Sequence, residues 1–206
     1  MKSIIFDVDG TLWDATPVAA RAWTRACMNA GLPYAHLTKE RMKAEFGKRM
    51  DDIAVSLISG VPREKAIAVG EEAIRIEDGL LREDPPKIYP GVREVFETLH
   101  GRGIPAVIVS NCQAGYIEIL IESHGLVPYV SGHLCYGDTG EGKPYNILES
   151  IRRFRLQDPV YVGDTAGDME ASKEAGLPFV FASYGYGEAE APDYRIDRPE
   201  DLLNLL

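Results

Sequence analysis

Short apolar segments alternate with longer stretches of helical periodicity over most of the chain. The predicted strands are the apolar runs at residues 4–6, 106–109, 160–162 and 179–181, with a further strand near Tyr129 and Val130. Stretches with helical spacing of apolar residues separate them, for example Ile117, Leu120 and Ile121. Near-continuous apolar strands joined by helices are typical of a parallel sheet with helices on both faces. We therefore predict an α/β fold with a Rossmann-like parallel sheet.

Residues 15 to about 84 differ from the rest, because this part contains only helical patterns. Thr16 followed by Pro17 is a typical helix start, and Gly31 with Pro33 is predicted to end that helix. Pro85-Pro86 then forms a stiff extended connector. The predicted parts are a core of residues 1–14 and 86–206 and an all-α domain of residues 15–85, inserted after the first strand.

The composition indicates a globular protein that neither crosses a membrane nor binds nucleic acid. Apolar residues make up 45% of the 206 residues, and no apolar run approaches the roughly 20 residues needed to span a bilayer. The formal net charge of −10 argues against a nucleic-acid partner, which clustered Lys and Arg would bind. Because the three cysteines lack CxxC spacing and the chain starts without a signal-peptide pattern, we expect a reducing, cytoplasmic location. The sequence indicates no oligomeric state, and the histidines are interpreted as structural or surface residues: His36, His100, His124 and His133.

Polar residues follow three of the predicted strands. They are Asp7 and Asp9 after residues 4–6, Ser110 and Asn111 after residues 106–109, and Asp164 and Asp168 after residues 160–162, with Lys143 between the last two groups. Parallel sheets bind ligands beyond the carboxyl ends of their strands, where the strand order reverses. We therefore expect Asp7, Ser110 and Asp164 to converge in one crevice, although an isolated Asp-x-Asp-Gly is also common as a solvated turn.

The four polar segments together resemble the motifs of the haloacid dehalogenase superfamily of hydrolases, of the phosphatase type. They are, in order, Asp7-Val8-Asp9-Gly10-Thr11, Ser110-Asn111, Lys143, and Gly163-Asp164 with Asp168. The resemblance covers essentially the whole chain, because the residues after Asp14 suit that family's inserted helical cap. It implies Mg²⁺-dependent hydrolysis of a small phosphomonoester, of the phosphoglycolate or sugar phosphate type.

The resemblance also implies roles for individual residues. Asp7 is the expected nucleophile, which forms an aspartyl-phosphate, and Asp9 is the expected general acid and base. The expected Mg²⁺ ligands are the Asp7 side chain, the Asp9 backbone carbonyl and the Asp164 side chain, with Asp168 orienting Lys143. The expected contacts of the phosphoryl group are Ser110, Lys143, the Asn111 amide and the backbone N–H groups of Gly10 and Thr11.

A basic turn within the helical part is a candidate for substrate binding. Gly47, Lys48 and Arg49 interrupt the helical pattern with one flexible residue and two cations. Such a loop could meet an anionic group of the substrate, so Lys48 and Arg49 are candidate substrate-binding residues. The alternative is an exposed basic turn with no part in the site.

Other functions use similar residues. A hexose-phosphate mutase of the same superfamily carries the same motifs and transfers the phosphoryl group to a sugar. A phospho-accepting receiver domain also combines acidic residues, Ser or Thr and Lys on a parallel sheet, but the helical insertion and the Asp-Gly-Thr turn argue against it. A non-catalytic protein that binds a phosphorylated metabolite is a further alternative, although every expected catalytic position is filled.

Overall fold

The computed structural model describes residues 1–32 and 37–206, which form two compact units. An α/β unit contains Met1–Asp14 and Lys87–Leu206, and a helical unit contains Ala15–Pro86. Pro33 and His36, for which the sequence predicts a helix stop and a structural or surface role, lie outside the described residues. Within the described ranges, no helix combines the length and the apolar character that crossing a membrane requires.

A six-stranded parallel sheet forms the centre of the α/β unit. Its strands are β1 (Ser3–Phe6), β2 (Ala106–Ser110), β3 (Gly132–Cys135), β4 (Pro159–Gly163), β5 (Phe179–Ala182) and β6 (Tyr194–Ile196). They lie in the order β3-β2-β1-β4-β5-β6, and Ile5 in β1 pairs with both Val107 and Tyr161. The strand order reverses at β1, so the carboxyl ends of β1, β2 and β4 meet at the edge where such sheets bind ligands. The predicted Rossmann-like sheet is confirmed.

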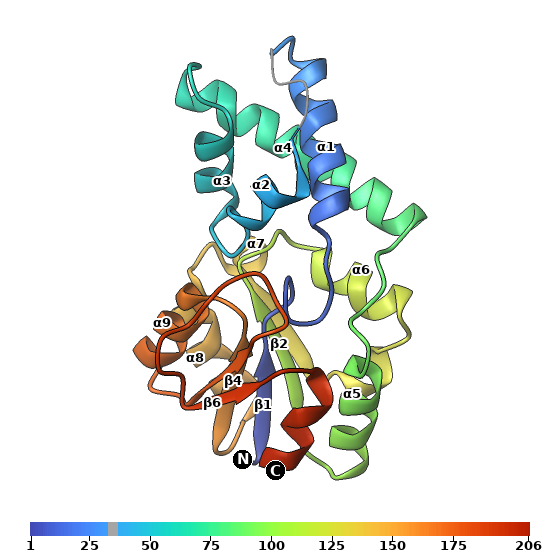
Figure 1. The fold of residues 1–206 in the computed structure, drawn as a ribbon, viewed down its shortest axis with the longest axis vertical. Coiled ribbons are helices and arrows are strands. Elements are labelled where there is room, and N and C mark those ends of the chain that lie inside the picture. The colour runs from blue at the N-terminus through green and yellow to red at the C-terminus, as the bar shows by residue number, and fades with distance from the viewer. Residues whose placement is uncertain (33–36) are drawn as a thin grey trace. The chain divides into compact units, whose positions relative to one another are not determined.

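Helices cover both faces of this sheet (Figure 1). α8 (Lys143–Phe154) packs against β2 and β3, and α9 (Ala166–Glu174) packs against β4 and β5. α5 (Val92–Gly101) and α6 (Tyr116–Ser123) lie on the opposite side, where Phe96 of α5 stacks on Phe6 with ring centroids 5.0 Å apart. Because both faces are buried, the central strands contain unbroken apolar runs, at residues 4–6 and 106–109, instead of alternating apolar and polar residues. The short elements are η1 (Val127–Tyr129), α7 (Tyr136–Thr139) and η2 (Pro199–Leu205).

The strand predicted near Tyr129 and Val130 is wrong. Residues Val127–Tyr129 form a 3₁₀ turn with Pro128 in its first positions, and the Tyr129 N–H donates to the Leu126 carbonyl at 2.9 Å. The strand begins after this turn, at Gly132, where an added Cβ would lie 2.2 Å from the Phe154 ring. Pro128 favours a turn at these apolar residues, so the strand forms further along the chain than their apolar character predicted.

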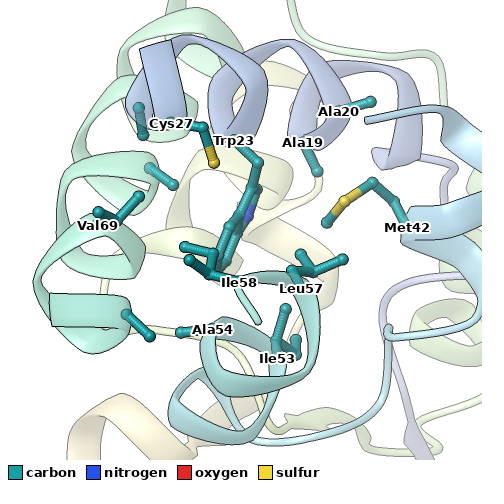
Figure 2. Packing of buried hydrophobic residues seen from close by; sticks show 13 residues of the cluster. Ala19, Ala20, Trp23, Cys27, Met42, Ile53, Ala54, Leu57, Ile58 and Val69 are labelled. Atoms are coloured by element: carbon teal, nitrogen blue, oxygen red, sulfur yellow. The ribbon is translucent and has the colours of Figure 1, made fainter. Parts of the chain in front are cut away.

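The helical unit surrounds a core of its own. Its helices are α1 (Thr16–Asn29), α2 (Lys39–Lys43), α3 (Met50–Leu57) and α4 (Arg63–Glu83). Trp23 lies at the centre of the cluster, among side chains from all four helices (Figure 2). Gly70 allows α4 to approach α1 and α3 closely, because a Cβ there would lie 2.9 Å from the Cβ of Ala54 and 3.3 Å from the Trp23 ring. The described residues of this unit form helices and no strands, as the sequence predicts.

Candidate active site

Three strands bring the predicted polar residues to one edge of the sheet. Asp7 directly follows β1, Ser110 ends β2 and Asp164 directly follows β4, and all three side chains are buried. The Asp7 N–H extends the sheet by donating to the Val162 carbonyl at 2.9 Å. Lys143 is the first residue of α8 and is also buried, with 4% of its surface exposed. The predicted convergence of these residues is therefore present in the structure.

Three carboxylates form a compact cluster at this edge. Asp7, Asp164 and Asp168 each offer an oxygen within 4.8 Å of the others, an arrangement that could hold a metal ion. Burial raises the pKa of Asp7 to about 6, and the Lys143 ammonium limits this rise. Burial also raises the pKa of Asp164 to about 8, with the negative charges of Asp168 and Asp7 adding to the effect. Packing these carboxylates together in a buried place disfavours their ionisation, which a bound cation would reverse.

One ammonium group lies within this cluster. Lys143 Nζ lies 2.8 Å from Asp7 Oδ1 and 2.5 Å from Asp168 Oδ1. Burial lowers the pKa of Lys143, but the charges of Asp168 and Asp7 outweigh burial and raise it well above its usual value. Lys143 therefore stays charged and links the strand β1 edge to helix α9.

Asp168 holds the turn that follows β4. Thr165 and Asp168 form a capping box at the start of α9, in which each side chain accepts from the backbone N–H of the other residue. The second carboxylate oxygen, Oδ2, also accepts from the Asp164 N–H at 3.2 Å and from the Thr165 hydroxyl at 2.7 Å. Gly163 makes room for this arrangement, because a Cβ there would lie 2.6 Å from the Asp168 Cβ. Asp168 thus fixes both Lys143 and the backbone of Asp164.

The residues around Asp164 fit a hard divalent cation. Carboxylate oxygens are the ligands that Mg²⁺ prefers, and the Lys143 ammonium pairs with two of these three buried carboxylates, Asp7 and Asp168. The Thr11 hydroxyl donates to Asp164 Oδ1 at 3.4 Å and so helps to orient this carboxylate. Gly10 has φ +82°, and a Cβ there would lie 2.1 Å from Asp164 Oδ2, so only glycine fits beside this carboxylate.

Two expectations about the ligands need correction or refinement. The N–H groups of Gly10 and Thr11 donate within their own turn, to the carbonyls of Trp13 at 2.9 Å and Val8 at 3.2 Å, and not toward a phosphoryl group. A tight turn satisfies its own donors, which the motif alone does not reveal. The carboxylate cluster consists of Asp7, Asp164 and Asp168. The expected ligand set has the Asp9 backbone carbonyl as its third member, with Asp168 only orienting Lys143.

The Asp9 carboxyl group accepts hydrogen bonds from two aromatic donors. Asp9 Oδ1 accepts from Trp13 Nε1 at 3.1 Å and from the Tyr116 hydroxyl at 2.8 Å. Burial raises the pKa of Asp9 to about 8, and the hydrogen bond from Tyr116 limits this rise. A carboxyl group with this pKa is protonated in much of the protein near neutral pH, as a general acid must be.

The comparisons with known proteins show the family of this chain. Residues 1–176 match the model of the haloacid dehalogenase-like hydrolases. This chain belongs to the haloacid dehalogenase-like hydrolase family. It is 28% identical over 221 residues to a phosphoglycolate phosphatase of Vibrio parahaemolyticus, covering all of this chain and 96% of that protein, and 27% identical over 235 residues to the one of Escherichia coli K12, covering 100% and 92%. A predicted phosphoglycolate phosphatase from Haemophilus somnus has the same fold, with a TM-score of 0.87 at 22% identity over 100% of this chain and 97% of that one.

This hydrolase contains a site element that the sequence did not reveal. The segment 184–187 wraps around Asp164. The Tyr186 N–H donates to Asp164 Oδ2 at 2.7 Å, and a Cβ on Gly185 would lie 2.3 Å from the Asp164 Cβ. The Tyr184 hydroxyl donates to the Thr11 carbonyl at 3.0 Å. The sequence signal for this element is the alternation of tyrosine and glycine, in which the tyrosines provide rigid anchors and the glycines allow close approach of the backbone.

The candidate substrate residues of the helical unit have partners within that unit. Lys48 Nζ lies 2.7 Å from Glu45 Oε2, and Arg49 Nε lies 3.2 Å from Asp52 Oδ2. Glu45 is buried and also accepts from the Ser56 hydroxyl at 2.9 Å, so it holds Lys48 in place. Both cations are about half exposed, and their predicted contribution to substrate binding stays a prediction.

Proposed function

We propose that this hydrolase is a Mg²⁺-dependent phosphatase that cleaves a small phosphomonoester through an aspartyl-phosphate on Asp7. The observation that carries the proposal is the cluster of three buried carboxylates, two of them paired with the Lys143 ammonium, at the edge of the sheet where ligands bind. Family membership and the names of the curated relatives point to the same chemistry.

The first step is a displacement at phosphorus. A carboxylate oxygen of Asp7 attacks the phosphorus atom, and the bond from phosphorus to the alcohol oxygen breaks. Asp9 gives its proton to the departing alcohol oxygen, which would otherwise leave as an unstable alkoxide. In the second step, water attacks the phosphorus atom while Asp9 takes the proton, and the bond from phosphorus to Asp7 breaks.

The charges near Asp7 decide whether this reaction is possible. A phosphate dianion repels an ionised carboxylate, and a bound Mg²⁺ supplies the positive charge that offsets this repulsion. Asp7 and Asp164, together with the predicted Asp9 carbonyl, would hold the cation. Lys143 Nζ, at 2.8 Å from Asp7 Oδ1, provides a further positive charge next to the nucleophile. Ser110 and Asn111, which follow β2 at the same edge of the sheet, are the proposed further contacts of the phosphoryl oxygens.

Phosphoglycolate is the first substrate to test, because both curated relatives described above are named phosphoglycolate phosphatases. A sugar phosphate is the second. The three cysteines all lie within the described residues, where they are buried and none of them forms a disulfide, which suits the proposed cytoplasmic location.

The test is phosphate release from a panel of phosphorylated metabolites, with Mg²⁺ and with EDTA, by the wild type and by Asp7→Asn. We expect release that requires both the metal and Asp7, and the highest kcat/KM would identify the substrate class. Isomerised sugar phosphate without free phosphate would instead identify a mutase. A folded, metal-binding protein that releases no phosphate from any compound would refute the proposal and favour phosphometabolite binding or a receiver-like function.

A further inference from the structure

Two aromatic donors hold one side of the Asp9 carboxyl group. Trp13 Nε1 and the Tyr116 hydroxyl both donate to the same oxygen, Oδ1, at 3.1 and 2.8 Å. In the part of the chain that the structure describes, no protein group donates to the other oxygen, Oδ2. The two oxygens of this carboxyl group therefore have different surroundings.

Both donors are rigid. Trp13 and Tyr116 are fully buried, and their rings meet edge to face with centroids 5.4 Å apart and an angle of 79°. The backbone of Trp13 is fixed as well, since its carbonyl accepts from the Gly10 N–H and Trp13 forms an isolated antiparallel β-bridge with Ile88. Tyr116 is the first residue of α6, directly after Gly115 with φ +90°. Neither donor can follow Asp9 to another rotamer without breaking this packing.

The chemistry of the donors determines where a proton sits on Asp9. An indole N–H can only donate, so Oδ1 acts as an acceptor toward Trp13. Because Oδ1 already accepts two hydrogen bonds, from Trp13 and Tyr116, the acidic proton of Asp9 is placed on Oδ2. The oxygen that carries the proton is thus the one that the protein leaves open.

We propose that Tyr116 and Trp13 are positioning residues for the proton transfer by Asp9: they hold Oδ1 as an acceptor and present Oδ2 to the leaving group. The proposal rests on the proposed function, because it assumes that Asp9 protonates the departing alcohol. During ester cleavage the proton on Oδ2 moves to the alcohol oxygen as its bond to phosphorus breaks. In hydrolysis of the aspartyl-phosphate, Oδ2 receives a proton from the attacking water.

The leaving group provides the test. Phosphoglycolate has a poor leaving group that needs a proton, whereas p-nitrophenyl phosphate has a good leaving group that does not. The ratio kcat/KM reports the steps up to alcohol release, so it isolates the first proton transfer. Tyr116→Phe keeps the ring and removes only the donor.

We expect Tyr116→Phe to lower kcat/KM for phosphoglycolate about 10-fold and kcat/KM for p-nitrophenyl phosphate less than about 3-fold. Asp9→Asn should show the same preference more strongly. Tyr194→Phe is the matched control, because Tyr194 lies in β6 with 41% of its surface exposed, and it should change neither value. Trp13→Phe, checked for its melting temperature, should repeat the pattern of Tyr116→Phe.

Equal losses of kcat/KM on the two esters, or no loss on either, would overturn the positioning role while leaving the proposed function intact. A structural defect would produce equal losses, because it does not depend on the leaving group. If the wild type released no phosphate from either ester with Mg²⁺, the proposed function itself would fail, and the positioning role with it.

Discussion

Replacing Lys143 by methionine tests whether the carboxylate cluster depends on one buried ammonium. Methionine keeps most of the aliphatic length and removes the charge. The side chains of Lys143, Asp7 and Asp168 are 5%, 5% and 1% exposed, so water cannot compensate for the loss. Removing one partner of such a buried pair costs about 3–5 kcal/mol of unfolding free energy. That is a large part of the roughly 5–15 kcal/mol that stabilises a typical domain.

The pH dependence of this loss follows from the carboxylates. Burial raises the pKa of Asp7 to about 6 even with Lys143 beside it, and without Lys143 the pKa rises further. A carboxyl group whose pKa is higher in the folded than in the unfolded state makes the protein less stable as the pH rises from the unfolded-state pKa to the folded-state pKa. The Lys143→Met variant should therefore lose most stability near pH 8 and much less near pH 5, where Asp7 is protonated.

The assay is urea denaturation in EDTA at about pH 5 and about pH 8, for the wild type and the variant. Lys173→Met is the matched control, since Lys173 is an exposed lysine in the last turn of α9, and its unfolding free energy should change by less than about 1 kcal/mol. A Lys143→Met protein as stable as the wild type near pH 8 would refute the reasoning about the buried cluster.

Three further predictions concern other parts of the protein. Gly185→Ala should lower kcat about 100-fold, because its Cβ would lie 2.5 Å from the Gly10 carbonyl and displace the site by a fraction of an ångström, whereas Gly79→Ala, in an open position of helix α4, should keep full activity and raise the melting temperature. In EDTA, the melting temperature should fall as the pH rises from about 4 to about 8, because burial raises the pKa of Asp9 and Asp164 to about 8 and that of Asp7 to about 6, and Asp9→Asn should make this dependence less steep. Lys48→Ala with Arg49→Ala should raise KM for phosphoglycolate and leave kcat unchanged, and an unchanged KM across several phosphorylated acids would exclude both residues from substrate binding.

The sequence predicted the centre of the sheet better than its edges. β1, β2 and β4 are buried on both faces, so each is an unbroken apolar run that stands out in the sequence. β3 and β6 are outer strands with partly exposed residues, and β6 contains only Tyr194–Ile196. Such short, mixed segments carry no periodic signal, which is why β3 was predicted too early and β6 was not predicted.

The candidate site shows the same division. Asp7, Ser110 and Asp164 could be brought together from the sequence, because each follows a strand whose carboxyl end has a known place in a parallel sheet. The contact of Tyr116 with Asp9 could not, since the two residues are 107 positions apart and the contact depends on how α6 turns its first residue. The contact of Tyr186 with Asp164 is made by a backbone N–H, which no side-chain pattern indicates.

Trapping the aspartyl-phosphate tests the central claim most directly. The wild type would be mixed with the best substrate of the panel and Mg²⁺, quenched in acid during turnover, reduced with borohydride and analysed by peptide mass spectrometry. An acyl phosphate is reduced to an alcohol, so we predict homoserine in place of Asp7, only with substrate and only when metal is present. Full phosphate release with Asp7 unreduced throughout turnover would contradict a covalent role for this residue.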